Sequence, residues 1–586
     1  MLVVLVNWLY IVLTTYLAGN ACMRLLSRLF GGKRADQAPS GSPFWDLFAG
    51  IMCTTCYAQI FSLFAGVRGW ANLFLLIFCA VYLAFFHSKI KKELSDRTSG
   101  SFFILAVVLL LAAFAFALVS AGPAKLIDTD WYHAQTIRWI EEFGCVTGVA
   151  NLFYSLGFNS AQHYFDALYS MRAVLGQSLH ATGGYFGLLL FCHGLCRLRS
   201  YKSRKRHIAD ALALAEVVYA IIITAFFADP YTDTLPNCLV FFILTEWISL
   251  LEEEEKEIFP YAFLCVFGVF ATVVKTSVVM VVLLVIQPAV WLVREKEWKK
   301  IAGYLLTGIL IAVPFFITNV KTTGYLVYLA SGVDLFDVPW KIDGDILRYS
   351  VDSMIHDARA VNATMEEALG SGLAWIPGWF KNDSISHQIL YIAVFLLLLL
   401  DLVLTTRYIL SLRRQERSKQ LPGQLSMLLP RIIVVIGLVY WLFTIPQVKY
   451  CWAFLLFPLT VIPAVHLERM ASGNNASSGK KLYSRLPAFL AAFTGGIVLL
   501  MYTGFYGLRT LGYMRDAFPA YLVRQADYEL HTMKPVEKDG LTFYIREEGG
   551  DIVCGYYVFP YLNEEELLDR LVVGEKLSDG FYLEKE

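Results

Sequence analysis

The sequence predicts an all-α protein that crosses a membrane many times. Of its 586 residues, 57% are apolar and only 17% are charged, and the mean hydropathy is +0.55. A soluble domain is about half apolar and about a quarter charged. Several continuous runs also reach the length of about 20 apolar residues that a helix needs to cross a bilayer. These runs are rich in Leu, Phe, Ala and Val and lack the alternation of barrel strands, so we expect helices.

The apolar runs predict about fourteen membrane-spanning helices. The first begins at Met1 without the basic stretch and cleavage site of a signal peptide, so we expect it to be retained. Three spans fall within residues 1–100, seven within 101–320 and four within 387–505. The expected spans are 2–18, 44–66, 69–86, 101–121, 181–197, 209–228, 236–251, 257–273, 276–293, 301–318, 387–406, 430–446, 450–466 and 487–505.

The charge of the connecting loops predicts the orientation. Short basic loops such as "KIKKELSDR" and "RLRSYKSRKRH" lie on one side, which marks that side as cytoplasmic. The acidic "EEEEKE" at 252–257 is the exception on this side, but acids count little in this rule. The large polar segments then face outward, in a multi-pass protein of the plasma membrane. They are the first outer loop at 122–180, a later loop at 321–386, and a tail at 506–586 that we expect to form a small extracytoplasmic α+β domain.

The first outer loop carries the most informative motif, "DTDWYHAQTIRWIEEFG" at 128–144. Asp128 and Asp130 directly follow a span, and an apolar stripe through Trp131 and Ile137 predicts a helix lying along the membrane surface. The segment "NLFYSLGFNSAQHYFDALYSM" predicts a second surface helix. Two acids can also merely end a hydrophobic span in water, and composition does not favour either interpretation.

Other polar residues are expected at similar depth. Lys275 interrupts an apolar run, and an ionisable residue there indicates function unless it snorkels to the interface. Lys449 with its neighbouring tyrosine either takes part in a site or anchors the chain at the interface. Turn chemistry is the favoured explanation for Asp229 and Asp233. The later loop mixes aromatic and charged residues, as a loop over a cavity would, although it can also be merely solvated: Asp334, Asp337, Trp340, Lys341 and Arg348.

These groups suit glycosyl transfer from a lipid-linked sugar. An acceptor hydroxyl needs a carboxylate to take its proton, and a departing phosphate needs a lysine, an arginine or a divalent metal beside it. Asp128 and Asp130 could hold Mg²⁺ or Mn²⁺, because hard cations favour oxygen ligands. Aromatic rings such as Trp131 and Tyr132, with His133 beside them, could bind the sugar. The cytoplasmic loops contain no nucleotide-binding motif, which favours a polyprenyl-phosphate donor and gives no reason to expect a nucleic-acid partner.

The order of these features resembles the GT-C superfamily of integral-membrane glycosyltransferases. Those enzymes share a seven-helix module whose first outer loop carries surface helices and the catalytic aspartate, with a long outer loop after the seventh helix. The counterpart here is 101–320, with the loops 122–180 and 321–386 in matching order. The motifs also look like a family of bacterial multipass proteins known only as membrane proteins. Two departures are the three helices before the module and the lone Cys554 in the tail, where that family carries paired cysteines.

The resemblance implies an enzyme that transfers sugar to a surface glycan or glycolipid among membrane lipids. It places the acidic motif on Asp128 and Asp130, with Asp128 preferred as the base because Asp130 begins the surface helix. Lys275, Arg348 and Lys449 are then candidates to bind the donor phosphate. Two alternatives stay open. One is a polysaccharide polymerase or ligase that acts on lipid-linked oligosaccharides, and the other is a lipid or sugar transporter without catalysis.

Overall fold

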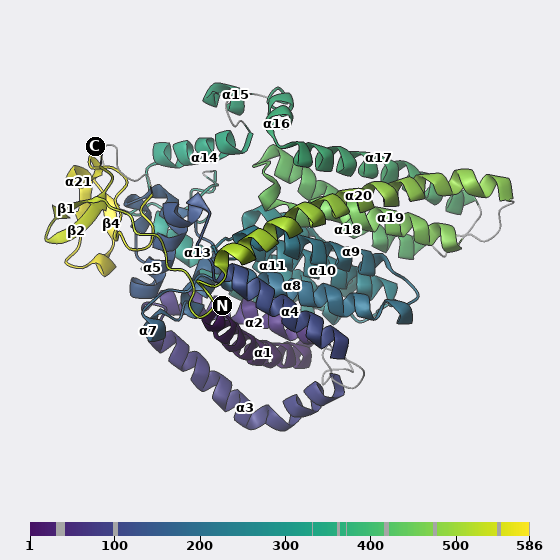
Figure 1. Cartoon of the computed structure of the whole chain (residues 1–586), viewed down its shortest axis with the longest axis horizontal. Coiled ribbons are helices and arrows are strands. Elements are labelled where there is room, and N and C mark those ends of the chain that lie inside the picture. The colour runs from purple at the N-terminus through teal and green to yellow at the C-terminus, as the bar shows by residue number, and fades with distance from the viewer. Residues whose placement is uncertain are drawn as a thin grey trace.

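The computed structural model describes most of the chain. The described residues are 1–30, 42–97, 103–330, 332–359, 364–370, 372–414, 421–472, 478–547 and 553–584. Long helices form a bundle, and four short strands form a small domain at one end of it (Figure 1). The prediction of a mostly helical protein with a small α+β region at the C-terminus is therefore confirmed.

Every expected span falls on helical structure. Eleven of the described helices are long and apolar enough to cross a membrane, and α11 is a shorter apolar helix. The remaining expected spans fall on α2 and α8, which do not meet those limits of length and composition. The bundle helices are α1 (Leu2–Phe30), α2 (Pro43–Ser62), α3 (Gly69–Arg97), α4 (Phe103–Ser120), α8 (Thr182–Arg199), α9 (Ile208–Ile222), α10 (Thr234–Glu252), α11 (Ile258–Val274), η6 (Thr276–Val285) continuing into α12 (Ile286–Arg294), α13 (Trp298–Thr323), α17 (Ile385–Arg414), α18 (Leu421–Phe443), α19 (Trp452–Ser472) and α20 (Ser478–Ala517).

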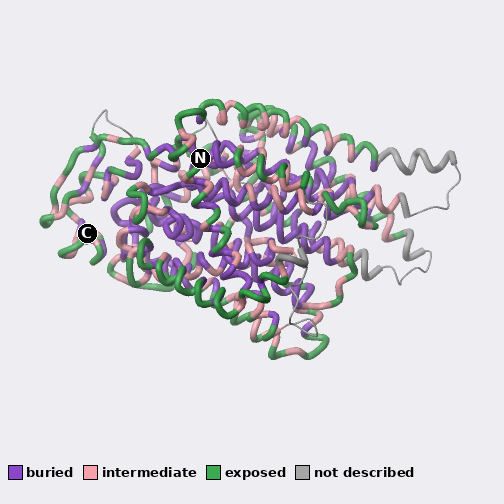
Figure 2. The backbone as a smooth tube through the Cα atoms, turned by 60° about the horizontal axis from the view of Figure 1, so that its bottom comes forward, coloured by how far each residue is buried: buried purple, intermediate pink, exposed green. Residues whose placement is uncertain are grey.

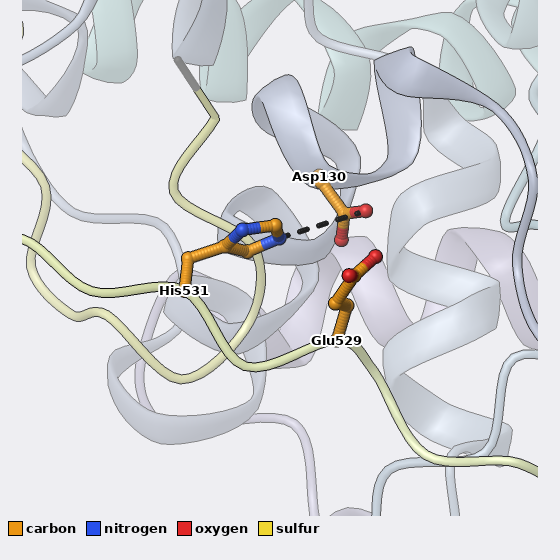
Figure 3. Close-up of side chains that lie close together, drawn as sticks. All are labelled: Asp130, Glu529 and His531. Atoms are coloured by element: carbon orange, nitrogen blue, oxygen red, sulfur yellow. Dashed lines mark ion pairs between the residues drawn. The ribbon is translucent and has the colours of Figure 1, made fainter. Parts of the chain in front are cut away.

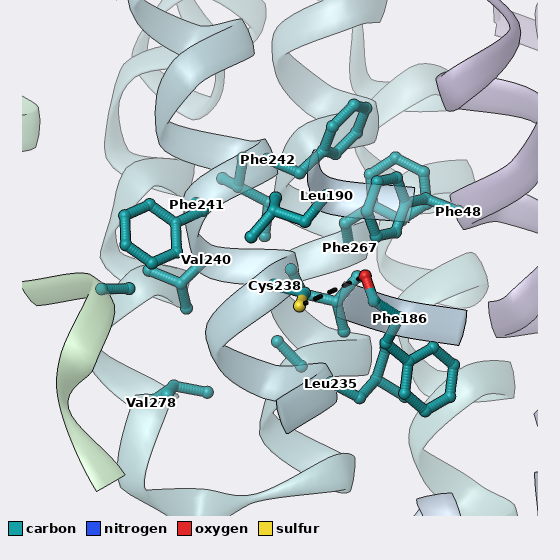
Figure 4. Packing of buried hydrophobic residues seen from close by; sticks show 14 of the residues in the cluster. Phe48, Phe186, Leu190, Leu235, Cys238, Val240, Phe241, Phe242, Phe267 and Val278 are labelled. Carbon is teal, nitrogen blue, oxygen red and sulfur yellow. Dashed lines mark hydrogen bonds between the residues drawn. The ribbon is translucent and has the colours of Figure 1, made fainter. Parts of the chain in front are cut away.

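The core of the bundle is built from apolar side chains of its central helices. Phe242 of α10 stacks on Phe48 of α2 at 4.3 Å between ring centroids and meets Phe267 of α11 edge-on (Figure 4). α10 is buried along nearly its whole length, whereas α3 and α17 keep many apolar side chains exposed. Figure 2 shows buried residues concentrated inside the bundle and exposed residues along its outside. This pattern is expected where central helices contact only protein and outer helices contact lipid.

Glycines set the close packing of the first two helices. A Cβ on Gly19 would lie 1.7 Å from the carbonyl oxygen of Asp46, and one on Gly50 would lie 1.7 Å from that of Thr15. Any larger residue would collide with the backbone of the neighbouring helix at these positions. Small residues of this kind let helix backbones approach closely within a membrane.

The first large loop contains several short helices. Its first part matches the expected surface helix, as η1 (Thr129–His133) runs into α5 (Ala134–Phe143). The second expected helix is wrong as a single element. The chain breaks at Gly157, where a Cβ would come within 2.8 Å of Tyr328, and Ser160 caps a new helix by accepting from the amide of Gln162. The resulting elements are η2 (Val149–Asn151), η3 (Tyr154–Gly157), α6 (Ala161–Tyr169) and α7 (Arg172–Leu175).

Shorter elements complete the connections. The later large loop folds into α14, α15 and α16, which lie beside the end of α17 in Figure 1. The bounds of these elements are η4 (Tyr201–Ser203), η5 (Ile223–Phe226), α14 (Gly344–Arg359), α15 (Met365–Leu369), α16 (Ile376–Asn382) and η8 (Val448–Tyr450).

The tail begins after α20 and docks on the first large loop. β1 (Lys534–Lys538) pairs antiparallel with β2 (Leu541–Ile545), and β3 (Leu571–Val573) with β4 (Phe581–Leu583); α21 (Leu567–Arg570) precedes β3. The amide of Phe581 donates to the carbonyl of Thr147, and that of Asn563 donates to Leu152. A shared apolar core contains Trp139 and Phe153 from the loop and Phe543 and Phe581 from the tail. The loop and the tail are therefore one folded unit.

Candidate functional site

A cavity of about 420 Å³ lies where the first large loop meets the ends of several helices. Asp128 and Tyr132 line it from the first loop, Lys275 from the junction of α11 and η6, and Lys449 from η8. The cavity thus gathers three segments in which the sequence predicts functional residues.

The carboxylate of Asp229 holds the start of the first loop in place. Its Oδ1 accepts from the backbone amides of Lys125 and Leu126 and from the hydroxyl of Thr129, at 2.7–3.1 Å. Burial raises the pKa of the Asp229 carboxyl to about 6, although these hydrogen bonds lower it. The backbone then makes the π-helical turn η1, in which the amide of Ala134 donates to the carbonyl of Thr129. Such turns are frequent at functional sites.

Asp128 enters the cavity just before this turn and faces Lys449. Its Oδ2 lies 3.4 Å from the ammonium nitrogen of Lys449, and each side chain is about one-third exposed. Burial lowers the pKa of Lys449, but Tyr450, Asp128 and Asp233 outweigh that effect and raise it above its usual value. Lys449 is therefore a cation throughout the neutral pH range.

Lys275 supplies a second cation because the helix is interrupted there. Its backbone is extended, with φ −154° and ψ 122°, between the end of α11 and the start of η6. Its ammonium group lies 2.9 Å from a carboxylate oxygen of Asp233, whose side chain is buried. Both lysine nitrogens also lie about 5 Å from the ring centre of Tyr450. These contacts join five side chains in one continuous row, in the order Asp233, Lys275, Tyr450, Lys449 and Asp128.

Sequence reasoning missed part of this row. The sequence favours turn chemistry for Asp233, and for Tyr450 it leaves a site and an interfacial anchor as alternatives, so neither residue is among the expected site residues. One signal could have found them. Asp233 and Tyr450 lie in loops that the sequence places on the same side of the membrane as Lys275 and Lys449. The sequence also did not single out several other residues of the lining, which are mainly aromatic or polar: Tyr154, Phe158, Phe315, Tyr328, Asn159, Asn319, Ser350, Asp357 and Gln447.

Asp130 does not line the cavity, and its carboxylate lies beside His531 and Glu529 of the tail (Figure 3). Its Oδ2 lies 3.8 Å from Nε2 of His531, and Glu529 stands beside both. Burial and the charge of Glu529 raise the pKa of Asp130, against the opposing effect of His531. A metal shared by Asp128 and Asp130 would need both carboxylates at one ion. The two acids instead have separate partners, and the only group in the described ranges that could hold a metal ion contains Asp130 without Asp128.

His133 lies behind the cavity wall rather than in it. Its Nδ1 is 2.7 Å from Nε2 of His163, and both rings are buried. Burial lowers the pKa of His163 to about 3 and that of His133 well below its usual value, with the neighbouring His163 adding to the latter effect. The pair is neutral at physiological pH, so it supports the wall and offers no charge to a ligand.

All five residues of the later loop that the sequence singles out lie outside the cavity. Trp340 donates its indole N–H to the carbonyl of Val320, Lys341 pairs with Asp334, and Arg348 is largely exposed and near Asp345. Asp337 is exposed as well. The loop still contributes to the cavity, but through other positions, namely Val327, Tyr328, Leu329, Ser350, Ser353, Met354 and Asp357.

Comparison with known proteins adds a family without an assigned function. The chain matches no curated protein and no solved structure. A family model described as "Domain of unknown function (DUF8201)" matches residues 1–456, which include every residue that lines the cavity. The match covers most of the chain, so this protein belongs to the DUF8201 family.

Proposed function

We propose that this protein is a GT-C-type glycosyltransferase that uses a polyprenyl-phosphate sugar at the cavity around Asp128. The observation that carries the proposal is the meeting of the Asp128 carboxylate with two lysines, Lys275 and Lys449, in a single cavity with aromatic walls. Transfer to a hydroxyl needs a base and a stabilised leaving phosphate at the same place, and the cavity offers both.

In the proposed reaction Asp128 takes the proton of the acceptor hydroxyl. The acceptor oxygen forms a bond to the anomeric carbon of the sugar, and the bond from that carbon to the phosphate oxygen breaks. The phosphate leaves on the polyprenyl chain with its negative charge beside Lys275 and Lys449. Because Lys449 is paired with Asp128, an arriving phosphate would draw the lysine towards itself and leave the carboxylate available as base. Rings such as Trp131, Tyr132 and Tyr154 are placed to pack against a sugar.

A second cavity of about 280 Å³ supports a lipid-borne donor. It borders the first, and both are lined by Asp357, Gln447 and Lys449. Eight of its other lining residues are apolar or aromatic, namely Ile222, Phe226, Ala358, Trp379, Pro446, Val448, Trp452 and Tyr506. The other four are polar or charged: Arg359, Asn382, Asp383 and His387. A prenyl chain would suit the apolar part of these walls, with its phosphate at Lys449 and its sugar in the larger cavity.

The proposed setting is the plasma membrane, with about fourteen spans and the cavity and tail on the extracytoplasmic face. The basic loops on the opposite side support this orientation. The acceptor would be a surface glycan or glycolipid. We propose that the lysines, rather than an ion between Asp128 and Asp130, neutralise the phosphate, because Asp130 faces the tail. Any effect of Mg²⁺ or Mn²⁺ would then act through Asp130.

The test compares wild type with Asp128→Asn in purified form, on a panel of polyprenyl-phosphate sugars with surface-glycan and glycolipid acceptors. Wild type should release free polyprenyl phosphate from at least one donor, and Asp128→Asn should release about 10²-fold to 10⁴-fold less, the usual contribution of a general base. Asp345→Asn is the matched control, because Asp345 lies outside the cavity with a side chain that is 89% exposed.

Two results would replace the proposal. Release from lipid-linked oligosaccharides alone would indicate a polymerase or ligase. Movement of labelled lipid across vesicles that persists in Asp128→Asn, with no release from any donor, would indicate a transporter.

A further inference from the structure

We infer that Asp130, Glu529 and His531 form a binding site for a divalent transition-metal ion such as Zn²⁺ or Mn²⁺, which fastens the tail to the first large loop. This inference does not depend on the proposed glycosyl transfer, because it concerns an ion and the folded chain alone.

The geometry of the three side chains is close to that of a ligand set. Each offers one ligand atom, and these atoms all lie within 4.8 Å of one another (Figure 3). Around a tetrahedral Zn²⁺ with bonds of about 2.1 Å, ligand atoms are about 3.4 Å apart. Small rotations of the side chains would close the difference. An imidazole nitrogen with two carboxylate oxygens favours Zn²⁺ or Mn²⁺ over Mg²⁺, which prefers oxygen ligands and retains its water.

The charge of the group also calls for a cation. Two carboxylates face one imidazole, so their negative charge exceeds what the histidine can balance. Oδ1 of Asp130 is buried and accepts no hydrogen bond from the part of the chain that the structure describes. A buried carboxylate oxygen without a partner is costly, and a metal ion would satisfy it. Glu529 is exposed, which leaves a route for the ion from solvent.

The backbone around the group is held in place independently of any ion. The carbonyl of Asp130 accepts from the amides of Cys554 and Gly555 at 3.1 and 2.8 Å. Gly555 has φ +59°, and a Cβ there would lie 2.6 Å from Cδ2 of His531. Only glycine therefore lets the imidazole approach Asp130 so closely. The ligands thus come from the first loop and from the tail, and backbone hydrogen bonds between these two segments hold them near one another.

An ion at this position would orient the cavity without touching a substrate. Asp130 belongs to η1, and its neighbours Asp128 and Trp131 line the cavity. Fixing the Asp130 side chain to the tail would fix the turn that directs those two side chains. Asp130 is in this sense a positioning residue.

The test is metal binding by the full-length protein, purified with its affinity tag removed and stripped with a chelator. Calorimetric titration with Zn²⁺ and with Mn²⁺ should show one equivalent bound by wild type. Glu529→Gln and His531→Asn should each weaken binding at least tenfold. Glu565→Gln is the matched control, since Glu565 is an exposed tail glutamate that pairs with Lys534.

Bound metal should also protect the tail against limited proteolysis in wild type and in Glu565→Gln, but not in Glu529→Gln. No binding of either ion by wild type would overturn the inference, and so would equal binding by wild type and both ligand variants. Neither readout needs a sugar donor, so failure here is distinct from failure of the proposed function.

Discussion

Asp128 and Lys449 lie 3.4 Å apart between Oδ2 and Nζ, although 321 positions separate them in the chain. One belongs to the loop after α4 and the other to the turn η8 before α19. The pair therefore exists only when the two halves of the bundle are assembled. It is partly exposed, so its contribution to stability is small, about 0–1 kcal/mol. Because the pair adds little stability, we propose that it serves binding or catalysis.

Replacing Lys449 by glutamine should lower turnover much more than stability. Without its charge, the leaving phosphate loses one of its two cations, which we expect to lower kcat about 10²-fold to 10³-fold. Lys449→Arg should retain a larger part of the activity because it keeps the charge. The measurement is the rate of polyprenyl-phosphate release at saturating donor, alongside apparent Tm. A Lys449→Gln variant with the wild-type rate would remove Lys449 from the mechanism.

Lys275 should behave differently, because its partner Asp233 is buried with 4% of its side chain exposed. Lys275→Gln leaves that carboxylate without its cation, so we expect a loss of about 1–3 kcal/mol of stability as well as activity. Adding Asp233→Asn removes the stranded charge and should restore most of the stability, but no activity.

The double variant thus separates the structural contribution of Lys275 from its chemical one. Thermal unfolding in detergent and product release would be measured on the same samples. Recovery of activity together with stability would show that Lys275 only supports the fold.

The spans were readable from the sequence because hydrophobic length is a local property. Each expected span falls on a helix, and the break at Lys275 is visible as a charge within an apolar run. Tertiary contacts were not readable. Glu141 falls outside the apolar stripe of α5, yet it is fully buried, and it accepts hydrogen bonds from Tyr556 of the docked tail and from Ser178 of the first loop.

The same limit applies to the site. The spacing of Asp128 and Asp130 places both acids in one expected site, as a possible metal pair or as base and orienting group. In the structure, however, Asp128 lies at the cavity and Asp130 at the tail. Glu529 and His531 lie about 400 positions away in a segment with no motif. Such a pairing depends on how the tail packs, which no local pattern encodes.

The buried histidine pair predicts a loss of stability in acid. The pKa of His163 is about 3 in the folded protein, owing to burial and secondarily to Lys275, whereas it is about 6.5 in an unfolded chain. Below about pH 6.5 the unfolded state binds a proton that the folded state does not, so stability falls by up to about 1.4 kcal/mol per pH unit. The fall should continue until the folded pKa is reached.

His163→Gln should therefore show a shallower decrease of apparent Tm than wild type between pH 6.5 and about 4. His87→Gln, at an exposed position of α3, is the control and should follow the wild-type curve. Parallel curves for wild type and His163→Gln would show that the pair does not titrate in this way.

Gly148 is the position at which a single methyl group should release the tail. Its φ is +64°, and a Cβ there would lie 1.9 Å from the carbonyl oxygen of Phe581 in β4 and 2.8 Å from Cβ of Trp340. Gly148 also donates its amide to the carbonyl of Lys321 at the end of α13. The first loop, the last bundle helix before the later loop, and the tail thus meet at one glycine.

Gly148→Ala should expose the tail to limited proteolysis and lower apparent Tm by more than backbone strain alone would. Gly176→Ala gives the strain by itself, because Gly176 has φ +74° and open space around its Cβ position. We expect Gly176→Ala to cost about 1 kcal/mol and to leave the tail protected. Equal behaviour of the two variants would mean that β4 can shift away from Gly148 at little cost, and that the tail is held by its apolar core with the first loop instead.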